Sequence, residues 1–172
     1  MRVRDILLLA AVVSGALLAL MVAAPFLAPS GTFGDLDGTP TVIDNGWLGH
    51  GPAGVAYLIG DVVCHQEMSR SFILNGSQMS MCIRDTGILI GLLLGFSACA
   101  AVRPRAMSLR WALLGAALVC VTVVEWLCEG MVGDMPGLRI ASGVCAGIGI
   151  SVLLCWYLCR DIADDADGRT LG

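Results

Sequence analysis

The chain has 172 residues, of which 57% are hydrophobic and only 14% are charged. Soluble domains are about one quarter charged, so this composition excludes an ordinary soluble enzyme and a disordered chain. The net charge of −4 and the lack of any basic run argue against nucleic acid as a partner. A mean hydropathy of +0.83 instead indicates a small protein of the lipid bilayer.

In chain order, four stretches are long and apolar enough to cross the hydrocarbon core of a membrane, which takes about 20 residues of helix. They lie at about 6–28, 83–102, 109–129 and 138–159. The first stretch follows two arginines, as a signal peptide does, but its apolar run is longer, and we interpret it as a retained anchor. We therefore expect an all-α membrane protein with four transmembrane helices, forming a single integral membrane domain over residues 1–172.

Residues 47–63 are also uncharged except for Asp61, and the arginines indicate whether they cross the membrane. With four spans and both termini in the cytoplasm, seven of the ten arginines are cytoplasmic, as the positive-inside rule requires. If residues 47–63 formed a fifth span, five arginines would lie on each side of the membrane. We therefore expect a multi-pass protein of the cell membrane, with an outer loop at 29–81 that carries a short re-entrant or interfacial half-helix, and a cytoplasmic tail at 160–172.

The polar residues suited to chemistry concentrate in residues 61–86, on the expected outer face. Cys82 and Asp85 are three residues apart and share one face of a first helical turn, whereas the adjacent Cys64 and His65 suit a helix end. Thiolate, imidazole and carboxylate are all zinc ligands. The pattern predicts a zinc site formed by these four residues, while a Cys64–Cys82 disulfide and two unrelated thiols remain alternatives.

Three arginines lie on the expected outer side, and their guanidinium groups are suited to a phosphate or carboxylate. Pairing with neighbouring acids explains them as well, because outer acidic residues outnumber outer arginines. We interpret one group as contacts to a substrate or as residues that orient the metal ligands: Gln66, Arg70, Arg84 and Arg139.

Glu125 interrupts a stretch that otherwise resembles a buried membrane helix. A carboxylate at this depth is costly unless it faces the bundle interior or a polar partner. We expect Glu125 to be buried against the bundle, near Arg139 or Arg84. A structural ion pair and a catalytic role as general base both account for it.

The block that begins at Cys64 resembles the pattern of a family of small predicted membrane proteins, domain of unknown function family 2085. The matching elements are Cys64-His65-Gln66, Arg70-Ser71-Phe72, Asn75-Gly76, Gln78 and Cys82-x-Arg84-x-Thr86-Gly87. Glu125 and the segment from Leu138-Arg139 to Ser142-Gly143 are also similar, so the resemblance extends over roughly residues 47–150. The resemblance implies a membrane fold and an important role for this block, without an established activity.

The chain departs from that family pattern at Asp85, where the family has a second cysteine. This difference removes a CxxC dithiol, which thiol–disulfide exchange would use. It retains an anionic metal ligand at the same place. The departure therefore favours metal binding over a redox relay.

These features predict an integral membrane protein with an outward-facing Cys/His/Asp metal site beside an Arg/Glu pocket. As an enzyme, it would catalyse metal-assisted hydrolysis or transfer on a lipid-borne or small anionic substrate. One alternative is a non-catalytic accessory or assembly subunit that docks a membrane-protein partner. The other is a thiol–disulfide protein that uses Cys64 and Cys82.

Overall fold

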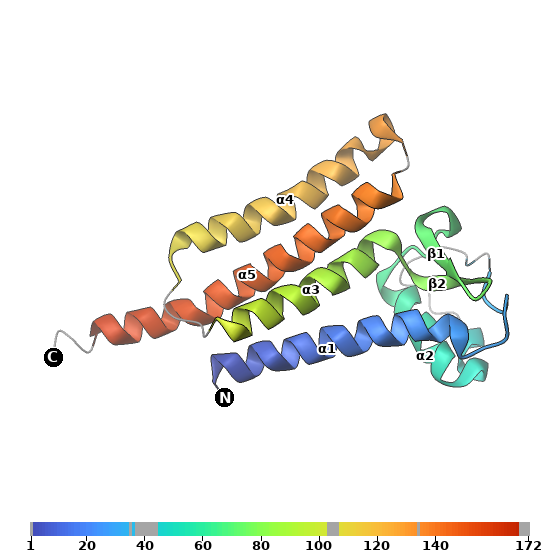
Figure 1. Cartoon of the computed structure of the whole chain (residues 1–172), viewed down its shortest axis with the longest axis horizontal. Coiled ribbons are helices and arrows are strands. Elements are labelled where there is room, and N and C mark those ends of the chain that lie inside the picture. The colour runs from blue at the N-terminus through green and yellow to red at the C-terminus, as the bar shows by residue number, and fades with distance from the viewer. Residues whose placement is uncertain (1, 35, 37–44, 103–106, 134, 169–172) are drawn as a thin grey trace. The chain divides into compact units, whose positions relative to one another are not determined.

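The computed structural model describes residues 2–34, 36, 45–102, 107–133 and 135–168. This part of the chain contains four helices that are long and apolar enough to cross a membrane (Figure 1). They are α1 (Val3–Ala23), α3 (Ile83–Ala101), α4 (Leu109–Val132) and α5 (Pro136–Gly168). The predicted all-α membrane fold with four candidate spans is confirmed.

Shorter elements follow α1 and precede α3. They are the 3₁₀ turns η1 (Ala24–Phe26), η2 (Asn45–His50) and η3 (Met68–Arg70), the helix α2 (Gly51–Val63), and the strands β1 (Ser71–Leu74) and β2 (Ser77–Cys82). With 13 residues, α2 is roughly 20 Å long, which is too short to cross a hydrocarbon core of about 30 Å.

The two strands form an antiparallel hairpin that we did not predict. Ser71 pairs with Cys82 and Leu74 pairs with Ser77, and the pairing is irregular between Ser71 and Ile73. Asn75 and Gly76 form the turn, both with positive φ. An Asn-Gly pair is a strong signal for a two-residue hairpin turn, because both positions tolerate this backbone conformation.

The chain divides into two compact units, and the boundaries fall within α1 and α3. One unit comprises Met1–Gly15 and Gly87–Gly172, and the other comprises Ala16–Thr86. We call them the helical unit and the hairpin unit.

Within the helical unit, glycines allow close packing of neighbouring helices. A methyl group added at Gly91 of α3 would collide with the carbonyl oxygen of Val144 in α5. A methyl group at Gly115 of α4 would lie 2.9 Å from the carbonyl oxygen of Gly149 in α5. Figure 1 shows α4 and α5 side by side. Small residues permit this approach of helix backbones, as expected for packing in lipid.

Within the hairpin unit, an aromatic cluster joins α2 to β2. The rings of Phe33 and Tyr57 stack with centroids 3.9 Å apart, and Trp47 packs against both. The hydroxyl of Tyr57 donates a 2.5 Å hydrogen bond to the carbonyl oxygen of Gln78 in β2. The indole of Trp47 donates to the buried carboxylate of Asp61. These contacts hold the end of α2 beside β2.

Candidate metal centre

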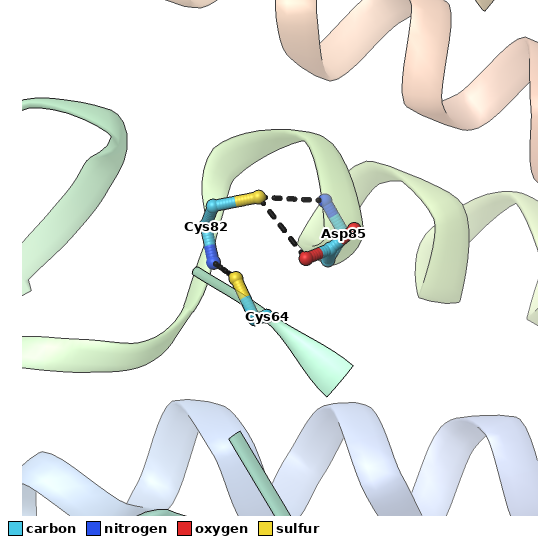
Figure 2. A group of neighbouring side chains, drawn as sticks. All are labelled: Cys64, Cys82 and Asp85. Carbon is cyan, nitrogen blue, oxygen red and sulfur yellow. Dashed lines mark hydrogen bonds between the residues drawn. The ribbon is translucent and has the colours of Figure 1, made fainter. Parts of the chain in front are cut away.

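Three of the four predicted ligands come together in the hairpin unit. Cys64 directly follows α2, Cys82 ends β2, and Asp85 lies in the first turn of α3. Their ligand atoms lie within 4.8 Å of one another, with Cys64 buried and the other two half-buried (Figure 2). In the described part of the chain, this is the one such group of at least three His, Cys, Asp or Glu residues.

Backbone N–H groups form hydrogen bonds to the sulfur of Cys64 and so fix its orientation. The chain leaves α2 at this residue in an extended conformation, and the Cys64 N–H still donates a 2.8 Å hydrogen bond to the carbonyl oxygen of Gly60. The Cys64 sulfur accepts hydrogen bonds from the backbone N–H of Gln66 at 3.5 Å and of Cys82 at 3.2 Å. Such donors stabilise the thiolate form of a cysteine, and the thiolate is the form that binds metals.

The other two ligands belong to the N-terminus of α3. Cys82 occupies the N-cap position, and its sulfur accepts a 3.4 Å hydrogen bond from the backbone N–H of Asp85. The Cys82 thiol in turn donates to the Asp85 carboxylate at 3.1 Å. A helix N-terminus favours negative charge, which suits a thiolate at Cys82.

The two thiols of this centre differ in acidity. The hydrogen bond to Cys82, and then burial, raise the pKa of the Cys64 thiol. The same hydrogen bond lowers the pKa of the Cys82 thiol. The hydrogen bond between the two sulfurs therefore shifts their two pKa values in opposite directions.

The side chain of Gln66 connects the two elements that precede the ligands, α2 and β2. Its side chain is 3% exposed, and Nε2 donates hydrogen bonds to the carbonyl oxygens of Ser80 at 3.0 Å and Tyr57 at 3.3 Å. Its backbone oxygen accepts a hydrogen bond from the side chain of Gln78. Gly60 leaves room for this arrangement, because a methyl group there would collide with the Gln66 amide and the Ser80 carbonyl. Gly60 was not among the predicted site residues, and its only signal in the sequence is its place one turn before Cys64.

The remaining predicted residues of the hairpin unit lie outside the ligand group. The side chain of His65 is exposed, and the extended backbone at Cys64 accounts for this because neighbouring side chains alternate in direction along extended chain. Arg70 forms a 3.0 Å ion pair with Glu67, and both side chains are about half exposed. Arg84 is half-buried in the first turn of α3.

Glu125 and Arg139 lie in the helical unit, where both belong to a polar network. Glu125 is 9% exposed, and the hydroxyl of Ser142 in α5 donates to its carboxylate at 3.2 Å. The same hydroxyl lies 3.0 Å from the carbonyl oxygen of Arg139. Arg139 is 4% exposed and forms an ion pair with Glu129. The predicted burial of Glu125 is confirmed, and Ser142 is a polar neighbour that we did not predict.

The comparisons with known proteins identify a family. A family model described as "Predicted membrane protein (DUF2085)" matches residues 64–153, which is more than half of the chain. The match begins at Cys64 and includes Cys82, Asp85, Glu125 and Arg139. No curated protein and no solved structure matches the chain. The chain therefore belongs to the DUF2085 family of predicted membrane proteins.

Proposed function

We propose that this membrane protein binds a zinc ion through Cys64, Cys82 and Asp85. The observation that carries this proposal is the convergence of three ligand atoms, from three different elements, within 4.8 Å of one another. Two thiolates and a carboxylate are accepted zinc ligands, and a zinc ion would draw the three atoms closer. The ion would also displace the proton held between the two sulfurs.

A purely structural role as a helix cap explains only part of this arrangement. An N-cap needs one acceptor for the N–H of the third helical residue, and the Cys82 sulfur supplies it. The cap gives no reason for a second, buried sulfur at the N-cap backbone. The position of Cys64 supports the metal proposal over the cap alone.

Three protein ligands leave one position of a tetrahedral zinc ion for water or substrate. The reaction class that suits such a site is metal-assisted hydrolysis or transfer, on a small anionic or lipid-borne substrate. His65 is the alternative occupant of the fourth position, because it adjoins Cys64 and is exposed. Binding by His65 would close the site and make the zinc structural.

Thiol–disulfide chemistry is the second candidate, favoured by the hydrogen bond between the two thiols. Cys64 and Cys82 would be oxidised to a disulfide while the disulfide of a partner protein is reduced to two thiols. This exchange would require only small movements of the two sulfurs, which already lie within 4.8 Å of each other.

The deciding experiment is elemental analysis of the full-length protein, purified in detergent without chelator, together with a count of free thiols. We expect stoichiometric zinc in the wild type and its loss in Cys64→Ser and Cys82→Ser. Cys120→Ser is the matched control, because this cysteine is exposed on α4 and outside the ligand group. Zinc-free protein with both thiols titratable would refute the metal proposal, and a Cys64–Cys82 disulfide would favour the second candidate.

A further inference from the structure

A second group of thiols lies in the helical unit. Cys99 is near the end of α3, and Cys155 and Cys159 are one turn apart on α5. Side-chain hydrogen bonds join Cys99 to Cys155 and Cys155 to Cys159. Cys155 and Cys159 are 2% and 0% exposed, whereas Cys99 is half-buried. Two helices thus contribute three sulfurs that form a continuous chain of contacts.

The surroundings of these sulfurs are apolar. The buried cluster around them contains Leu7, Ala11, Phe96 and Ala100. Among the described side chains, no carboxylate or imidazole forms a ligand group with these sulfurs. A single buried cysteine needs no explanation beyond packing, because it behaves as a small hydrophobic residue. Here Cys155 lies between two further sulfurs, and the three thiols together offer soft donors.

The donor set determines which ion suits this place. Thiolate sulfur is a soft ligand that selects Cu(I), zinc or iron–sulfur clusters. A structural zinc ion takes four ligands, and its two positive charges need more compensation in apolar surroundings than one charge does. Cu(I) is monovalent and accepts two or three sulfurs. We propose that Cys99 and Cys155 bind Cu(I), with Cys159 as an additional sulfur.

The positions of these three cysteines near the ends of α3 and α5 would give an ion access to them. The candidate span of α3 ends at Ala101 and that of α5 ends at Cys159, so the thiols lie at span ends rather than at mid-membrane. Cys99, which is half-buried, is the sulfur from which the ion would enter. The arginine distribution places these span ends on the cytoplasmic side.

The test is a titration of the reduced, full-length protein in detergent with Cu(I) buffered by bathocuproine disulfonate. The Cys64→Ala/Cys82→Ala background removes the proposed zinc centre, so failure of one proposal is distinguishable from failure of the other. In this background we expect Cys155→Ala to bind one Cu(I) fewer per chain, and the control Cys120→Ala to bind as much as its parent. Equal Cu(I) binding by Cys155→Ala and its parent would overturn the proposal.

A second measurement needs no substitution in the buried cluster. In the same Cys64→Ala/Cys82→Ala background, stoichiometric Cu(I) should slow the alkylation of Cys99, as followed by mass spectrometry, and leave the alkylation of Cys120 unchanged. An unchanged rate at Cys99 would overturn the proposal even if the Cys155 variant failed to fold.

Discussion

The backbone N–H of Cys82 donates a 3.2 Å hydrogen bond to the sulfur of Cys64, which lies 18 positions earlier in the chain. This bond joins the end of α2 to the beginning of α3. In many helices, the N-cap N–H is satisfied by a carboxylate at the third helical position. Here a sulfur accepts it, and the Asp85 carboxylate remains available for the Cys82 thiol or for a metal ion.

The first prediction concerns Asp85 as a ligand. We expect Asp85→Ala to lower the zinc content, because it removes one of three ligand atoms. Asp85→Cys should retain or increase zinc binding, because it supplies a thiolate at the same position. Elemental analysis of both variants in detergent tests this. Equal zinc content in the alanine variant and the wild type would exclude Asp85 from the site.

The second prediction concerns the close approach at Gly60. In Gly60→Ala, the added methyl group would force apart α2, the Gln66 amide and the Ser80 carbonyl. Overpacking of this kind costs about 1–3 kcal/mol, so we expect a lower thermal midpoint together with weaker zinc retention. Gly49→Ala is the control, because nothing lies within 4 Å of its added methyl group. Equal midpoints for the two variants would contradict this packing.

The third prediction compares two ion pairs of different burial. Arg139→Ala should destabilise the protein by about 3–5 kcal/mol, because it leaves the Glu129 carboxylate, 13% exposed, without this ion-pair partner. Arg70→Ala should change stability by about 0–1 kcal/mol, because both side chains of its pair are about half exposed. Unfolding in detergent with increasing denaturant measures both. Similar effects of the two substitutions would be inconsistent with the buried pair.

The fourth prediction concerns orientation in the membrane. In a variant without native cysteines, Ser69→Cys should react with a membrane-impermeant maleimide in intact cells. Ser108→Cys should react only after permeabilisation, because it precedes α4 on the expected cytoplasmic side. Both serines are exposed, so burial of the side chain does not limit either reaction. The reverse pattern would place the proposed zinc centre in the cytoplasm.

The sequence by itself determined the four candidate spans and their helical structure. In a bilayer every backbone N–H must be satisfied within its own segment, so long apolar composition is sufficient to predict a helix. The three-residue spacing of Cys82 and Asp85 was also sufficient to place both in one helical turn. The Asn75–Gly76 pair is a usable signal for the hairpin, but the expectation for the outer loop at 29–81 included a half-helix and no strands.

Only the tertiary structure decided which residues meet over long distances. Cys64 reaches Cys82 because the hydrogen bond from the Tyr57 hydroxyl to Gln78 and the absence of a side chain at Gly60 bring α2 against β2. The choice between the neighbours Cys64 and His65 depends on the extended backbone at the helix end, which turns one side chain inward and the other outward. Packing of α4 against α5 likewise selects Ser142 as a partner of Glu125. Each outcome depends on the relative placement of separate elements, which local residue patterns do not specify.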